Sequence, residues 1–315
     1  MTHCKVYLAA EERGDIGWRT VLGTHGLSGE DLFGDAALID LLDHFPREHL
    51  YALNMGHDPC RSDQNHLVCH DGVSGAELLQ AVRSGRLWLN VTRVDRVDAR
   101  YRRLIDRLYN ELRLQTPLQR AAAVPDRSQG TLLISSPGAL VYFHADAPSS
   151  VLWHLRGRKR VWIYPTLDER FMSAALLEDL FAGARHEYLP YRPDFDLSAD
   201  VYDLEPGQWL CWPQNAPHRV QNLDGLNVSL STEHFSRDSC RRAQLYRANR
   251  YLRRHWRLAQ PSACETGVTA RAKVWVQRVA RRLGLDPVPR TVDQPVLRIS
   301  PAAPDGVVVL ERAGP

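Results

Sequence analysis

Short runs in which hydrophobic and polar residues alternate dominate the middle of the chain. Between residues 131 and 235 these runs follow one another, separated by Pro and Gly residues. The runs are TLLIS, ALVYFHAD, SVLWHL, RKRVWIYP, WLCWP, HRVQNL and LNVSLST. Short strands at such regular spacing are typical of a β-sandwich or a barrel. The pattern therefore predicts a core built mainly from β-strands.

Helices are predicted before and after this core, because apolar residues recur there every three or four positions. The predicted helices span residues 35–45, 74–82, 97–112, 236–258 and 266–283, and residues 50–55 and 86–94 read as strands between the first three. Ser74 and Glu77 form a capping box at the start of the second helix. Asp35 is the expected cap of the first helix.

One further helix is expected inside the β-rich part. Thr166 and Glu169 match a capping box, and Gly183 is the expected end. The chain from residue 287 onward, rich in Pro and Val, is predicted to be an extended arm. These elements divide the chain into an N-terminal part of helices and flanking strands (1–125), the β core (126–235), a basic helical segment (236–286) and a tail (287–315).

Composition sets few further limits. With 315 residues, of which 44% are hydrophobic, the chain can bury a full core. The net charge of +3 does not imply a nucleic-acid partner, and we interpret the arginines of residues 236–258 as a solvated helix face. The six cysteines show no disulfide framework, and neither a secretory signal nor a membrane-spanning run is found. We therefore expect a cytoplasmic protein with reduced thiols and no membrane partner.

A polar loop between residues 56 and 72 holds several residues that could bind a metal. They are His57, Cys60, His66, Cys69 and His70. Paired CxxC spacing is absent, so a polar loop is favoured over a zinc site.

A stronger candidate for metal chemistry lies in the first half of the β core. Period-two alternation places Tyr142, His144 and Asp146 on one face of a strand. His218 begins a later strand and can lie opposite them if the sheet curls into a barrel. Two histidines and one carboxylate form the facial triad of open non-haem iron sites. The sequence therefore predicts a metal site at His144, Asp146 and His218.

A lysine accompanies this triad. Lys159 shares one strand face with the apolar residues Val161 and Ile163. A lysine in that position needs an anionic partner, since burying an unpaired ammonium is costly. The alternative is an exposed charge on an edge strand. Ser229 and Ser231 lie on the polar face of another strand, which would be a ligand-binding feature inside a barrel.

The segments HADAPSSVLWHLRGRKRVWIYP and PGQWLCWPQNAPHRVQN together resemble the JmjC and cupin-like oxygenases that depend on Fe(II) and 2-oxoglutarate. These include the asparaginyl hydroxylase type that acts on hypoxia-inducible factor. The resemblance covers roughly residues 35–235. It implies an α+β fold with a mainly β core, namely a double-stranded β-helix (jelly-roll or cupin) with N-terminal flanking helices and a C-terminal helical segment.

The same resemblance implies an activity and a ligand set. Fe(II) would be held by His144, Asp146 and His218, and Lys159 would pair with the distal carboxylate of 2-oxoglutarate. Oxygen would be consumed, succinate and CO2 released, and a C–H group of a protein, peptide or natural-product substrate hydroxylated. In such proteins C-terminal helices often build a homodimer interface, so we expect residues 236–283 to serve assembly.

Three positions differ from the family pattern. Trp88 stands where a tyrosine usually contacts the co-substrate, and it offers only an indole N–H donor. Val141 replaces a common Thr or Ser, and Ser150 replaces a common Asn. The remaining candidates for co-substrate contacts are Trp88, Asn90, Tyr142, Ser229 and Ser231.

Two other functions stay open at the level of sequence. One is a metal-binding cupin that isomerises or hydrolyses a small molecule without oxygen. The other is a non-catalytic cupin-like sensor or regulator that binds a partner through its basic C-terminal helices.

Overall fold

The computed structural model describes residues 6–27, 30–115, 129–183, 188–258, 261–287, 294–303 and 305–310. Its helices are α1 (Asp35–His44), α2 (Gly75–Ser84), α3 (Val94–Val97), α4 (Ala99–Gln115), α5 (Ala174–Ala182), α6 (Arg237–Trp256) and α7 (Gly267–Arg282). Its strands are β1 (Val6–Tyr7), β2 (Val21–His25), β3 (Leu50–Asn54), β4 (His66–Cys69), β5 (Leu87–Val91), β6 (Gln129–Ser135), β7 (Leu140–His144), β8 (Ser149–Arg156), β9 (Lys159–Ile163), β10 (Asp200–Leu204), β11 (Gln208–Cys211), β12 (His218–Asn222), β13 (Asn227–His234), β14 (Leu297–Ile299) and β15 (Val307–Val309).

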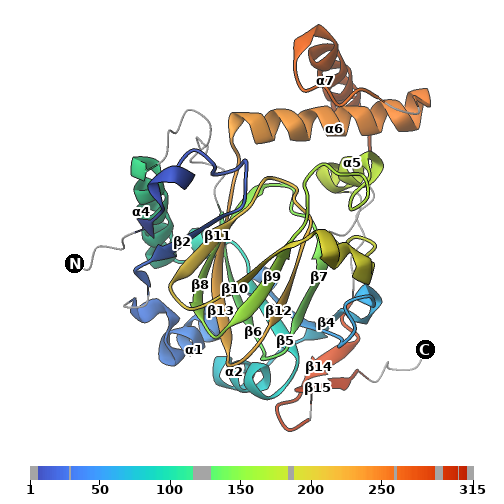
Figure 1. Cartoon of the computed structure of the whole chain (residues 1–315). Coiled ribbons are helices and arrows are strands. Elements are labelled where there is room, and N and C mark those ends of the chain that lie inside the picture. Colours follow the sequence, from blue (N-terminus) through green and yellow to red (C-terminus); the bar gives the residue numbers. More distant parts are fainter. Residues whose placement is uncertain are drawn as a thin grey trace, which may run out of the picture.

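The strands form two sheets that share the β-rich part of the chain. The smaller sheet has the order β10-β9-β12-β7, and the larger one contains the neighbours β11-β8-β13-β6. Along the chain, β6 to β9 and β10 to β13 pass back and forth between the two sheets (Figure 1). This is the winding of a double-stranded β-helix, so the predicted α+β fold with a jelly-roll core is confirmed.

The N-terminal strands and the C-terminal tail extend the larger sheet on both sides. Strands β1 and β2 join beyond β11, while β5, β3, β4, β14 and β15 continue beyond β6. The tail was expected to be an extended arm, but its strands β14 and β15 pair antiparallel with each other, and β14 pairs in parallel with β4. The unpaired backbone groups at the β4 edge provide the hydrogen bonds for this docking. Residues 288–293 of the predicted arm lie outside the described residues.

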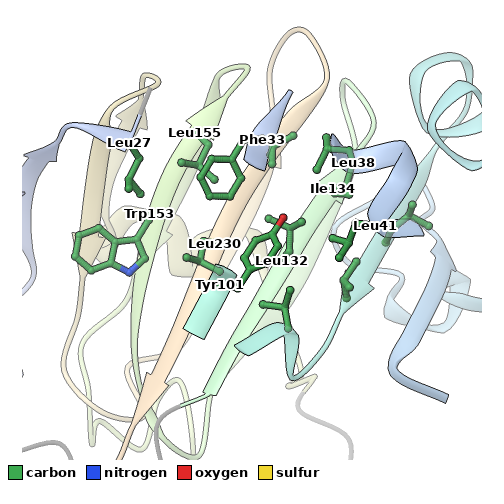
Figure 2. Close-up of a cluster of buried hydrophobic side chains, with 14 of the residues drawn as sticks. Leu27, Phe33, Leu38, Leu41, Tyr101, Leu132, Ile134, Trp153, Leu155 and Leu230 are labelled. Carbon is green, nitrogen blue, oxygen red and sulfur yellow. The ribbon is translucent and has the colours of Figure 1, made fainter. Parts of the chain in front are cut away.

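Alternation within the strands of the larger sheet separates a hydrophobic core from the interior of the barrel. Leu132, Ile134, Trp153, Leu155 and Leu230 are all buried in a cluster with residues of the N-terminal helices. Figure 2 shows these side chains on one face of the sheet, against Leu38 and Leu41 of α1 and Tyr101 of α4. The positions between them face the smaller sheet. The helices cover one face, and the other face is left to form a site.

Two predicted helix starts need correction. Ser74 does form its capping box with Glu77, but Asp35 is the first residue inside α1, because Gly34 is the cap. Thr166 does not start a helix, since Leu167 adopts a positive φ of 58° and the Thr166 hydroxyl donates to the Gln214 carbonyl. Helix α5 begins eight residues later, with Ser173 as its cap.

The C-terminal helices lie outside the two sheets. Helix α6 contacts α5 and α7, and α7 lies on the side of α6 away from the sheets (Figure 1). Their bounds agree closely with the predicted ranges. In the described part of the chain, no helix combines the length and the apolar character that crossing a bilayer requires.

Candidate metal centre and cavity

An irregularity in β7 determines which of its side chains enter the barrel. His144 pairs with His218, but Val141 pairs with Val220, so β7 has one residue more than β12 over this stretch. This β-bulge changes the parity of the strand. Val141 consequently lies on the same side as His144. Phe143 packs with Trp162 and Tyr164 on the outer face of the smaller sheet, and Tyr142, like His144, contacts the ring of Tyr188.

The predicted triad does converge. His144 ends β7, His218 begins β12 next to it, and Asp146 follows two residues after His144. The Asp146 carboxylate oxygens lie 4.0 Å from His144 Nε2 and 3.7 Å from His218 Nε2. In the described part of the chain, this is the one group of His, Cys, Asp or Glu residues whose donor atoms are close enough to hold a metal ion. Bonds of about 2.1 Å place two donors about 3 to 4 Å apart across an ion, so the spacing fits.

Backbone carbonyls orient both imidazoles for this purpose. Nδ1 of His144 donates to the carbonyl of Tyr142 at 2.7 Å, and Nδ1 of His218 donates to that of Ala216 at 3.0 Å. The Nε2 atoms are therefore left as acceptors that face Asp146. Burial, followed by the nearby His144, lowers the pKa of His218 to about 4, which keeps this ring neutral and able to bind a metal near pH 7.

Neighbouring polar groups hold Asp146 in place. The Ser150 hydroxyl donates to one carboxylate oxygen at 3.0 Å, and the Asn215 amide donates to the Asp146 backbone carbonyl at 2.7 Å. Asn215 adopts a positive φ of 64° in the turn before β12. Ser150, singled out as a departure from the family pattern, thus orients the carboxylate.

The triad borders a cavity of about 210 Å³ between the two sheets. The cavity is lined by Trp88, Asn90, Thr92, Thr131, Leu133, Ser135, Val141, His144, Asp146, Leu152, Lys159, Trp212, His218, Val220, Asn222, Ser231 and Glu233. Its small volume suits a small organic acid rather than a larger ligand. Both sheets contribute polar lining residues, and those of the larger sheet lie on the face opposite the hydrophobic core.

Lys159 occupies the other end of this cavity. Its strand β9 lies between β10 and β12, so the alternative of an exposed edge-strand charge is wrong, and the side chain is only 4% exposed. Lys159 lies opposite Asn222, whereas His218 lies opposite Ile163, four residues further along β9. Burial lowers the pKa of Lys159 to about 7, and none of the described residues gives its ammonium a hydrogen bond or a carboxylate.

The candidate co-substrate contacts divide into two groups. Trp88, Asn90 and Ser231 line the cavity, and the buried Oδ1 atom of Asn90 has no hydrogen-bond partner. Tyr142 lies outside the lining, and its hydroxyl accepts a hydrogen bond from the Gly56 amide at 2.9 Å. Ser229 is fully buried outside the lining and hydrogen-bonded to Nδ1 of His154 at 3.0 Å. The hydroxyls of Tyr142 and Ser229 are therefore both hydrogen-bonded within the protein.

Sequence reasoning missed Glu233, which also lines the cavity. It follows Ser231 at a spacing of two, so the same alternation that selected Ser231 would have found it. Val141, noted only as a departure from the family pattern, also proves to be part of the lining.

Two other regions do not compete with this site. The loop with His57, Cys60 and His66 assembles no group of metal donors among the described residues. A larger hollow of about 570 Å³ lies between α6 and α7, and its lining contains arginines and Trp275 but neither His nor Asp. The smaller cavity is the chemical site because the convergent donors lie there.

Known structures share the fold. A crystal structure of E. coli ycfD matches with 15% identity and a TM-score of 0.51, over 89% of this chain and 69% of that one. A structure described as YcfD, a ribosomal oxygenase from Escherichia coli, in complex with cobalt and 2-oxoglutarate, matches with 14% identity and a TM-score of 0.50, over 88% and 68%. No family model and no curated protein matches the chain.

Proposed function

We propose that this chain is an oxygenase dependent on Fe(II) and 2-oxoglutarate, which hydroxylates a C–H group of a protein, peptide or natural-product substrate. The observation that carries the proposal is one cavity with two complementary ends. One end holds the buried group His144, Asp146 and His218, and the other holds the ammonium of Lys159 without a counter-charge. A metal ion would bind the triad at the first end, and one carboxylate of a dicarboxylate would pair with Lys159 at the second.

The donor set fits ferrous iron. His144, Asp146 and His218 would hold the ion through two imidazole nitrogens and one carboxylate oxygen, which leaves positions for further ligands. Hydrogen bonds to Tyr142 and Ala216 carbonyls keep the imidazoles in the required tautomer. Ser150 holds the carboxylate in its orientation.

The separation between the two ends fits 2-oxoglutarate. Four residues along β9 correspond to about 13 Å between the backbone levels of Lys159 and of the histidines. An extended lysine side chain and a five-carbon dicarboxylate together cover that distance. Lys159 would bind the distal carboxylate in a charge-assisted contact. Trp88, Asn90 and Ser231 would form the polar wall beside the bound acid.

Bound iron and 2-oxoglutarate supply the oxidising chemistry, in which O2 is consumed and succinate and CO2 are released. The residues of this chain bind and orient those groups. The apolar side chains of Val141, Leu152 and Trp212 in the cavity wall exclude water from the reacting centre.

The test combines binding and turnover. We expect the purified protein to bind Fe(II), then 2-oxoglutarate under anaerobic conditions with a charge-transfer absorption band, and to form succinate when oxygen is admitted. His144→Ala and Asp146→Ala should lose metal binding and succinate formation, whereas Glu48→Gln, an exposed control, should keep both. Full succinate formation in the two triad variants would refute the proposal. Turnover of a substrate without oxygen and 2-oxoglutarate would instead support the isomerase or hydrolase alternative.

Further features of this proposal concern partners and location. The description of the similar E. coli protein as a ribosomal oxygenase supports a protein substrate for this chain. We also expect a cytoplasmic protein that forms a homodimer through α6 and α7. Sedimentation as a monomer at micromolar concentration would contradict the dimer.

A further inference from the structure

The hollow between α6 and α7 lies apart from the metal site, because these helices stand outside the two sheets (Figure 1). Its volume of about 570 Å³ is in the range of cavities that hold a ligand or a protruding part of one. Its floor is apolar, since Leu245 of α6 and Ala270 of α7 are buried there and Val274 is half-buried. It shares no lining residue with the cavity between the sheets. The hollow is therefore a separate candidate for a binding site.

The rim of this hollow carries positive charge that the protein does not neutralise. Arg271 and Arg278 line it from α7 and are exposed, and neither forms an ion pair with any of the described residues. The acidic lining residue Glu265 is already bound by Arg242 of α6 at 2.7 Å. Arg241 is paired with an aspartate of its own helix. The two arginines of α7 are thus left to attract an anion.

An exposed aromatic ring lies between these two arginines. Trp275 follows Arg271 by four residues and precedes Arg278 by three, so the three side chains share one face of α7. Trp275 lines the hollow and is 67% exposed, which is unusual for so large an aromatic side chain. The two arginines are two helical turns apart, about 10 Å along the axis. Such a spacing suits a chain of anionic groups better than a single one.

Single-stranded nucleic acid combines the features that this surface would recognise. Its phosphates pair with arginines, and its bases stack on aromatic side chains whatever their sequence. An acidic peptide would use the arginines but would leave the indole of Trp275 without a flat partner. A second copy of this chain facing the same hollow would bring like charges together. A homodimer would therefore use other surfaces of α6 and α7.

We propose that the hollow between α6 and α7 binds single-stranded nucleic acid, with phosphates at Arg271 and Arg278 and a base stacked on Trp275. The net charge of +3 does not reveal this surface, because it sums charges of both signs over the whole chain. The inference goes beyond the proposed oxygenase function and does not depend on it, since the two sites have no lining residue in common.

Fluorescence anisotropy of a labelled RNA strand of about twelve nucleotides measures binding to the full chain. The comparison ligands are the duplex of the same sequence, adenosine monophosphate as a competitor, and a peptide of glutamates. The variants are Arg271→Gln, Arg278→Gln, Trp275→Ala and Trp275→Phe. The matched controls are Arg96→Gln, at an exposed arginine of α3, and Trp18→Ala, at a tryptophan that is 56% exposed. Thermal unfolding of each variant verifies that these exposed positions leave the fold intact.

We expect the affinity for the single strand to fall about sevenfold or more between about 50 and 200 mM salt, as two phosphate contacts require. Arg271→Gln and Arg278→Gln should each reduce the slope of log affinity against log salt by about 0.7. Trp275→Ala should weaken binding about fivefold to a hundredfold with an unchanged slope, and Trp275→Phe should keep most of the affinity. Both control variants should bind as the wild type does.

Several results would overturn the inference. One is the absence of binding at about 100 µM protein and 50 mM salt, and another is an equal loss of affinity in Arg96→Gln or Trp18→Ala. Tighter binding of the glutamate peptide would assign the hollow to an acidic protein instead. Equal binding of the duplex would contradict stacking on Trp275, and adenosine monophosphate binding as tightly as the strand would indicate a mononucleotide site.

Discussion

The buried ammonium of Lys159 should make the ligand-free protein less stable than it would be without that charge. The pKa of Lys159 is lowered from 10.5 to about 7 by burial alone. Between these values the unfolded chain binds more protons than the folded protein, so the free energy of unfolding rises with pH through this window. The difference between the two pKa values of Lys159 lowers the free energy of unfolding by about 4 kcal/mol at pH 7. At pH 9.5 it lowers the free energy of unfolding by about 1 kcal/mol.

Lys159→Met removes the charge and keeps most of the side-chain volume. We expect the variant to raise the free energy of unfolding at pH 7 by up to about 4 kcal/mol, and to lose the increase in stability between pH 7 and pH 9.5. At the same time 2-oxoglutarate should bind at least about tenfold more weakly, because one charge-assisted contact is lost. The most stable protein in this comparison would therefore be the one that binds the co-substrate poorly.

Urea denaturation at the two pH values measures the first effect, and calorimetric titration of the metal-loaded protein with 2-oxoglutarate measures the second. Arg158→Met is the matched control, since Arg158 is a neighbouring exposed cation paired with Glu205. Its removal should change stability by no more than about 1 kcal/mol. An unfolding free energy of Lys159→Met equal to or below that of the wild type at pH 7 would show that the ammonium has a partner or reaches water.

Two further substitutions test the construction of the site and of the sheet. Ser150→Ala removes the hydroxyl that holds Asp146, so metal affinity should fall by about tenfold or more in a metal titration, with unchanged unfolding behaviour as its control. Gly23→Ala in β2 would place a methyl group 2.4 Å from the Trp209 ring, and should lower the free energy of unfolding by about 1 to 3 kcal/mol. Gly14→Ala, with no atom within 4 Å of the added carbon, should cause a much smaller change, and equal effects of the two would argue against the packing of β2 on Trp209.

Much of the architecture follows from local patterns. Alternation along β6 and β13 identified strands that are buried on one face, and the larger sheet buries Leu132, Ile134 and Leu230 as that alternation requires. The Ser74 capping box formed as predicted because all of its atoms belong to one helical turn. The match at Thr166 failed because its hydroxyl binds Gln214, a partner far along the chain that no local pattern includes.

The sequence alone also determined the chemistry at the two ends of the site. His144, Asp146 and His218 were identified from residue types that bind metals, and Lys159 from a charge on an otherwise apolar strand face. Strand pairing then brought these residues to a single cavity, as His218 lies beside His144 and Lys159 lies on the same strand as Ile163. Residue type is a property of the sequence, so these assignments did not depend on the exact register.

The details of the cavity wall were decided by tertiary structure. One extra residue in β7 added Val141 to the cavity wall, because a bulge reverses the side of every residue beyond it. A bulge forms where the pairing of two distant strands requires it, and the β7 sequence does not reveal that pairing. The surroundings of Glu233 were likewise decided by tertiary structure. Strand pairing places Glu233 beside Ser150, whose hydroxyl binds Asp146, and both residues lie more than 80 positions away in the sequence.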